Sequence, residues 1–146
     1  MYALNDIYKL YFTDMGLFFA KVGFSAISAF LRDDSSSVIG YIYENIAADT
    51  LIKQGYDLYY SNNGVTELDF LIETKEGPAI IEVKKGNQQS KSARAVIEGR
   101  ANRHANVCYK IRNANFGRGA YFNGVPHYGF IFLLKKIRKE LIDSLK

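Results

Sequence analysis

Two neighbouring segments in which apolar and polar residues alternate constrain the fold of this chain most. Residues 67–73 (ELDFLIE) and 79–84 (AIIEVK) each repeat with a period of two, which is the pattern of a half-buried β-strand. The residues between them include Lys-Glu-Gly-Pro at 75–78, a typical turn sequence. The sequence therefore predicts two consecutive strands joined by a turn.

Further helix and strand patterns lie on both sides of this strand pair. Apolar spacings of three, four and seven predict one or two helices near the N-terminus, and glycines there favour a break. The predicted helices cover residues 8–31, 38–54, 90–105 and 128–145, the predicted strands cover 57–61, 67–73, 79–84 and 107–111, and 113–124 is a predicted loop. This order predicts one domain over residues 1–146, of the α/β (α+β) class, in which helices pack on a mixed sheet.

Composition excludes several other classes of protein. The chain has 146 residues, of which 48% are hydrophobic and 23% charged, a globular rather than a disordered composition. No apolar run approaches the ~18 to 20 residues of a membrane span, and the N-terminus lacks the pattern of a signal peptide. We therefore expect a cytoplasmic protein with no membrane partner. A single cysteine, Cys108, excludes a disulfide framework, and two histidines, His104 and His127, make a zinc site unexpected.

Charge is divided unevenly along the chain. Residues 1–84 carry six Lys or Arg and twelve Asp or Glu, for a net charge of −6. Residues 85–146 carry thirteen Lys or Arg and three Asp or Glu, for a net charge of +10. This asymmetry favours a polyanionic partner, and the alternative is two solvated surfaces of opposite sign.

The two central strands carry a candidate set of reactive side chains. Asp69 is followed, after twelve residues, by Glu82-Val83-Lys84, and alternation places Glu82 and Lys84 on one face of their strand. A four-residue turn would pair Thr74 with Ala79, set Asp69 opposite Lys84 and set Leu71 opposite Glu82. A turn of three or five residues would move Asp69 to the other face of the sheet.

Glu44 is a further carboxylate that the predicted helix over residues 38–54 places on a face of small and apolar residues, beside Ala47, Ala48 and Leu51. Burying an unpaired charge costs several kcal/mol, so Glu44 is either a functional carboxylate or an ion-paired one that reaches solvent. If this helix covers the strand face, the carboxylates and Lys84 could bind a hard cation. Oxygen ligands of this kind suit Mg²⁺ or Mn²⁺, which lowers the pKa of a bound water and neutralises phosphate oxygens.

The basic half of the chain contains candidate contacts to nucleic acid. The predicted helix over residues 90–105 is rich in Lys and Arg, and its alternative role is a solvated surface. The predicted phosphate-contacting residues are Lys91, Arg94, Arg100, Arg103 and Gln88. Arg112, Arg118, Tyr121 and Phe122 interleave charge with aromatic rings, which suits single-stranded nucleic acid or a surface loop that packs on the core.

Together these motifs resemble the PD-(D/E)XK nuclease superfamily. The resemblance rests on Glu44 in a helix, Asp69 in ELDF and Glu82-Val83-Lys84 in IIEVK, within a core of about residues 38–112. It implies a restriction-endonuclease-like core of helix, three strands, helix and strand, with extra terminal helices. It also implies that Asp69, Glu82 and the Val83 carbonyl bind the metal and that Lys84 is the catalytic lysine. Glu44 would complete the site or bind a second metal.

A narrower resemblance covers roughly residues 8–134. The stretches KLYFTDMGL, GYIYENIAADTLIKQG, ELDFLI, IIEVKKG and GVPHYGFIFL look like the C-terminal module of unknown function in bacterial and archaeal AAA-type ATPases. The sequence has no G-x-x-x-x-G-K-[ST] motif, so we do not expect it to hydrolyse ATP by that route itself. The resemblance implies a fragment of a longer ATPase or a stand-alone relative.

Three functions are therefore expected from the sequence. The first is a Mg²⁺- or Mn²⁺-dependent nuclease that hydrolyses nucleic-acid phosphodiesters, with DNA favoured. The second is a catalytically silent domain that binds DNA or a protein partner for an attached ATPase domain. The third is an interaction domain whose N-terminal helix and exposed aromatic residues serve formation of a homo-oligomer or contact with an ATPase domain.

Overall fold

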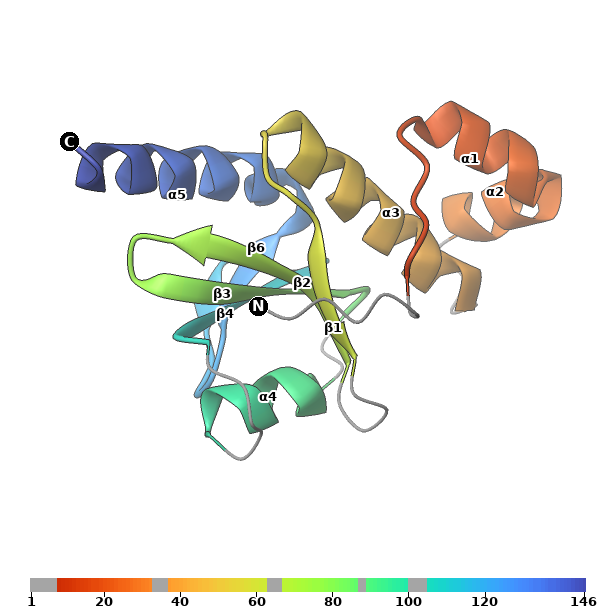
Figure 1. Cartoon of the computed structure of the whole chain (residues 1–146). Coiled ribbons are helices and arrows are strands. Elements are labelled where there is room, and N and C mark those ends of the chain that lie inside the picture. Colours follow the sequence, from red (N-terminus) through yellow and green to blue (C-terminus); the bar gives the residue numbers. More distant parts are fainter. Residues whose placement is uncertain (1–7, 33–36, 63–66, 87–88, 100–104) are drawn as a thin grey trace.

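The structure of this chain is a computed structural model that describes residues 8–32, 37–62, 67–86, 89–99 and 105–146 (Figure 1). Its helices are α1 (Met15–Val22), α2 (Phe24–Leu31), α3 (Ser37–Lys53), α4 (Lys91–Ile97) and α5 (Phe130–Ser144), with a 3₁₀ turn, η1 (His127–Gly129), before α5. Its strands are β1 (Tyr59–Asn62), β2 (Glu67–Thr74), β3 (Gly77–Lys84), β4 (Val107–Arg112), β5 (Gly117–Arg118) and β6 (Asn123–Pro126). The predicted class is confirmed, as is the order of helix, three strands, helix and strand from α3 to β4.

The described residues form a six-stranded mixed sheet in the order β1-β2-β3-β4-β6-β5. The first three strands are antiparallel, β3, β4 and β6 are parallel, and β5 returns antiparallel to β6. Figure 1 shows α3 and α5 on one side of the sheet and α4 on the other, with α1 and α2 beside α3. Helices on both sides of the sheet bury the central strands.

Both faces of the sheet carry an apolar core. On the α3 and α5 side, Leu51 of α3 packs in one cluster with Phe70 and Ile81 of the central strands. On the α4 side, Val96 packs in a second cluster with Ile80. A third cluster joins α1 to the N-terminal half of α3. This packing sets α3 across the sheet and brings Glu44 near the ends of β2 and β3.

The register of β2 and β3 differs from the prediction by two residues. Thr74 pairs with Gly77 rather than with Ala79, so the turn contains only two residues. Gly77 makes this tight turn possible because it adopts a φ of 103°, a conformation that glycine reaches without strain. Continuing this register places Asp69 opposite Glu82, and the predicted Asp69–Lys84 pairing is wrong. The predicted partner of Glu82 is also wrong, because Leu71 pairs with Ile80.

A β-bulge in β2 interrupts the predicted alternation at Asp69. Tyr59 pairs with Leu71 and Ser61 pairs with Leu68, so Asp69 and Phe70 together face the single residue between them in β1. Leu68 consequently packs with Leu71 on the α4 side, whereas Phe70 packs on the α3 side. The predicted period of two over residues 67–73, which would place Leu68 and Phe70 on one face, is therefore broken at the bulge.

The helix boundaries near the N-terminus and at α4 also depart from the prediction. Residues 8–14 are not helical, and α1 begins at Met15 because the Asp14 carboxylate caps it by accepting the Leu17 N–H. The predicted break occurs at Gly23, which has a φ of 84°. Helix α4 ends at Ile97, well before residue 105, since Gly99 follows with a φ of 70°.

The C-terminal part of the chain contains two strands that the sequence pattern did not indicate. Residues 113–124, predicted as a loop, contain β5 and the start of β6. These strands are short and contain Gly, Asn and Pro, which have low strand propensity, so only their pairing with β4 and with each other forms them. The last helix begins at Phe130 rather than at 128, after η1. None of the helices in the described ranges is long and apolar enough to cross a membrane.

Candidate functional site

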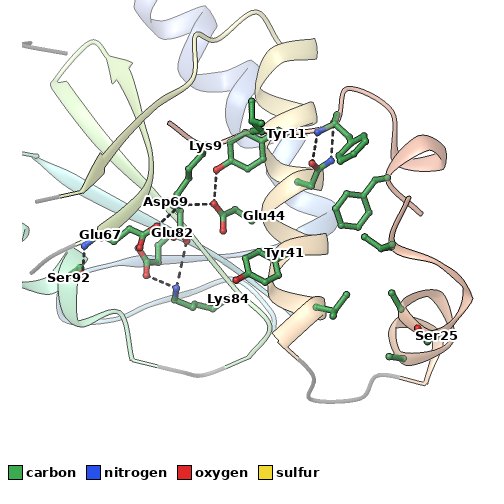
Figure 2. A pocket seen from close by; sticks show the side chains of 18 of the residues that line it. Lys9, Tyr11, Ser25, Tyr41, Glu44, Glu67, Asp69, Glu82, Lys84 and Ser92 are labelled. Atoms are coloured by element: carbon green, nitrogen blue, oxygen red, sulfur yellow. Dashed lines mark hydrogen bonds and ion pairs between the residues drawn. The ribbon is translucent and has the colours of Figure 1, made fainter. Parts of the chain in front are cut away.

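The structure brings Asp69, Glu82 and Lys84 together at the end of the β2–β3 pair. The Lys84 Nζ atom lies 2.9 Å from Glu82 Oε1 and 3.7 Å from Asp69 Oδ2. Figure 2 shows these three side chains converging on one side of the sheet, with Glu44 of α3 beside them. The predicted convergence of two carboxylates and one lysine is therefore present.

The Asp69 side chain binds the backbone of β3 next to the bulge in β2, where the β2–β3 pairing ends. The pairing of β2 with β3 runs from Thr74 and Gly77 to Phe70 and Ile81, and Asp69 is the next residue along β2. Its Oδ2 atom accepts the backbone N–H of Val83 at 2.8 Å. A side-chain acceptor thus satisfies a backbone donor where the strand pair ends, which holds the carboxylate in place.

Burial and charge shape the electrostatics of this site. Burial, together with repulsion from Glu82, raises the pKa of Asp69 to about 6. Burial lowers the pKa of Lys84 but the neighbouring carboxylates outweigh it, so the pKa is raised overall and Lys84 carries a full positive charge at neutral pH. The Glu82 side chain is 4% exposed, and its Oε2 atom has no hydrogen-bond partner among the described residues. A buried carboxylate oxygen of this kind is a position where a cation could bind.

Glu44 has ion-pair and hydrogen-bond partners that the sequence analysis missed. Its Oε1 atom accepts from Lys9 Nζ at 2.8 Å and from Tyr11 Oη at 2.6 Å, and Lys9 also contacts Glu67 Oε1 at 2.6 Å. Glu44 is therefore ion-paired in this structure. The signal that could have indicated a non-helical segment before Met15 was Asp14, a strong N-cap residue.

These residues line a groove of about 1180 Å³ between the sheet, α1, α2, α3 and residues 9–12. One end of the groove carries the carboxylates and lysines of the site, whereas the other is lined by apolar side chains such as Phe18, Val22 and Ala26. Within the groove the Lys84 side chain is 26% exposed and the Asp69 side chain 14% exposed, so a ligand can reach them, whereas the Glu82 side chain is only 4% exposed.

The predicted nucleic-acid contacts divide into three groups. Lys91 lines the acidic end of the groove. Arg94 is directed elsewhere, because its Nε atom contacts Glu98 Oε1 at 2.7 Å and its guanidinium lies 5.6 Å from the centre of the Tyr121 ring. Gln88, Arg100 and Arg103 lie outside the described residues. Among the described candidates, Lys91 is the one that the fold places beside the carboxylates.

Three other residues named in the sequence analysis, Phe122, Cys108 and His127, are packed against neighbouring side chains. Phe122 packs against the core on the α4 side, so the packed-loop interpretation holds for this ring. Cys108 is fully buried on β4, as expected of a core residue. His127 stacks on Tyr43 with ring centres 4.3 Å apart, and burial lowers its pKa. His104 lies outside the described residues.

The residues present fit a metal ion through two carboxylates rather than three. Within the described ranges, no group of three or more His, Cys, Asp or Glu side chains is placed to hold one ion. Asp69 and Glu82 remain as a pair, and Mg²⁺ is commonly bound through one or two carboxylates while it keeps several waters. The partnerless Glu82 Oε2 atom is the observation that fits such an ion.

Comparison with known proteins gives a family but no activity. A search of the curated proteins and a search of the solved structures found no match. One family model, described as a domain of unknown function (DUF4143), matches residues 39–128, which include α4, all six strands and nearly all of α3. Because this match covers more than half of the chain, the protein belongs to the DUF4143 family.

Proposed function

We propose that this domain is a Mg²⁺- or Mn²⁺-dependent nuclease of the PD-(D/E)XK type, which hydrolyses nucleic-acid phosphodiesters and favours DNA. One observation carries the proposal. Asp69, Glu82 and Lys84 converge in an open groove, and one buried oxygen of Glu82 has no partner among the described residues. The order of elements from α3 to β4 supports the same superfamily.

Each side chain has a role that follows from its position. Asp69 and Glu82 would hold the ion, with the Val83 carbonyl as a further ligand. A bound Mg²⁺ or Mn²⁺ would lower the pKa of a water and neutralise phosphate oxygens. Lys84, held between the two carboxylates, would orient the attacking water or offset charge on the phosphate. Lys91 at the same end of the groove would contact the backbone of the nucleic acid.

A cleavage assay with matched variants tests the proposal. Single- and double-stranded DNA and RNA would be incubated with the protein and Mn²⁺, Mg²⁺ or EDTA. We expect metal-dependent cleavage that falls at least about 100-fold in Lys84→Ala, because positioned proton transfer and charge stabilisation contribute this much or more. Lys135→Ala, an exposed lysine of α5, is the control and should cleave normally. Equal cleavage by wild type and Lys84→Ala would refute the proposal.

A second candidate is a catalytically silent domain that binds DNA or a protein partner beside an AAA-type ATPase domain in cis. The observation that favours it is the engagement of Glu44 by Lys9 and Tyr11, which leaves two rather than three carboxylates for a metal. This candidate predicts salt-sensitive DNA binding that survives Asp69→Asn and weakens in Lys91→Ala. DNA binding that does not change with salt would contradict it. A cytoplasmic location and self-association remain predictions.

A further inference from the structure

Residues 8–14, which we name the N-terminal strap, cross the acidic end of the groove. The strap lies outside the residues that match the family model. It is fixed to α3 by Asn45, a residue only 2% exposed. The Asn45 side chain accepts the Phe12 N–H at 2.8 Å and donates to the Phe12 carbonyl at 2.9 Å. Because both backbone groups of one residue are bound, the position of the strap along α3 is set.

The strap delivers the Lys9 ammonium to a point between two carboxylates. Lys9 Nζ lies 2.8 Å from Glu44 Oε1 and 2.6 Å from Glu67 Oε1, and its side chain is 21% exposed. The Tyr60 ring lies beneath it, with the ring centre 5.7 Å from Nζ. Two carboxylate oxygens within 3 Å of one point, next to an aromatic face, form a site for a positive charge.

The two lysines of the site divide the four carboxylates between them. Lys84 contacts Glu82 and Asp69, whereas Lys9 contacts Glu44 and Glu67. The carboxylates around Lys84 and those around Lys9 differ in how fully their oxygens are hydrogen-bonded. Glu44 Oε1 accepts two hydrogen bonds, but Glu82 Oε2 has none from the described residues. The six charges leave a formal excess of −2, which one divalent ion balances, and without Lys9 the excess would be −3.

We propose that the Lys9 ammonium occupies the position beside Glu44 and Glu67 that a second cation would otherwise take, so that this site binds one divalent ion. Lys9 is thereby a built-in cation supplied by a segment outside the family match. The inference rests on the proposed metal-dependent function. It also gives Glu44 the role of anchoring Lys9 rather than of binding the first ion.

Counting bound Mn²⁺ in the absence of nucleic acid tests this inference. Titration calorimetry would give the number of ions, and the electron paramagnetic resonance spectrum of Mn²⁺ would report two ions in one site through their spin coupling. We expect one ion in the wild type and two in Lys9→Met, which keeps the apolar stem and removes the charge. The double variant Lys9→Met/Glu44→Gln should return to one ion. Lys21→Met, an exposed lysine of α1, is the matched control and should bind one.

The outcomes separate this inference from the proposed function. Two ions in the wild type, or a single ion in a folded Lys9→Met variant, would overturn the inference and leave the metal site intact. No ion in the wild type would overturn the proposed metal-dependent function and the inference with it. Circular dichroism establishes folding, and Lys9→Gln replaces Lys9→Met if the latter does not fold.

Discussion

Replacing Asp69 by asparagine should stabilise the metal-free fold at neutral pH. The Asp69 side chain is 14% exposed and lies beside Glu82, and burial with this repulsion raises its pKa to about 6. Asparagine carries no charge, and its side-chain oxygen can still accept the Val83 N–H that Asp69 accepts at 2.8 Å. The substitution therefore removes an unfavourable charge and retains the hydrogen bond that ends the strand pair.

The magnitude follows from the two pKa values. Each pH unit between the folded and unfolded pKa is worth about 1.4 kcal/mol, so raising it from 3.8 to about 6 makes ionisation of Asp69 cost up to about 3 kcal/mol. This pKa already includes the attraction to Lys84 and the Val83 hydrogen bond, so we expect Asp69→Asn to be more stable by up to about 3 kcal/mol. Because the folded pKa is the higher one, the cost is absent below pH 4 and grows as pH rises through 6.

Urea unfolding in EDTA at pH 4, 6 and 7.5 measures this effect. It would be followed by circular dichroism, since the chain contains no tryptophan. The free energy of unfolding of Asp69→Asn should match that of the wild type at pH 4 and exceed it at pH 7.5. Glu73→Gln, at an exposed position of the same strand, is the control and should show no such trend. A variant that is less stable than the wild type at pH 7.5 would refute the reasoning.

Three further predictions concern the packing that positions the site. Asn45→Ala should lower the free energy of unfolding by about 2 kcal/mol, because it removes two hydrogen bonds to the strap. Trypsin should then cut faster after Lys9, and an unchanged rate of cleavage would contradict this. Leu51→Ala should cost about 2 to 5 kcal/mol by urea unfolding, whereas its neighbour Ile52, which is 46% exposed, should tolerate alanine with a far smaller loss. Tyr56→Phe should cost about 1 kcal/mol, because it removes the 2.8 Å hydrogen bond to α5, and an unchanged unfolding midpoint would count against that contact.

Much of the strand pair could be predicted because alternation is a local property. The predicted turn was two residues too long, yet Asp69, Glu82 and Lys84 still converge. A shift of two residues moves every pairing but keeps each side chain on its face. A shift of one residue would have separated Asp69 from the other two. The prediction thus depended on whether the turn contained an even or an odd number of residues. The conformation of Gly77 set that number at two.

Local patterns could not predict the strap. Lys9 and Tyr11 lie 35 and 33 positions before Glu44 in the sequence, and their contacts depend on how the strap crosses α3. The apolar spacing of residues 8–31 favoured one or two helices that begin at residue 8. In the structure Leu10 is 85% exposed, because the strap is held through its backbone by Asn45. A buried side-chain amide, such as that of Asn45, that binds the backbone of another segment leaves no periodic pattern in the sequence.

By itself, the sequence determined the element order from α3 to β4 and placed two carboxylates and a lysine at the ends of adjacent strands. It could do so because hydrophobic periodicity and turn residues act over a few positions. Only the tertiary structure decided the environment of these side chains. The bulge at Asp69 requires the pairing of β1 with β2, and the partners of Glu44 require the strap. Both arise from contacts between distant segments, whose geometry is set when helices and sheet pack into one core.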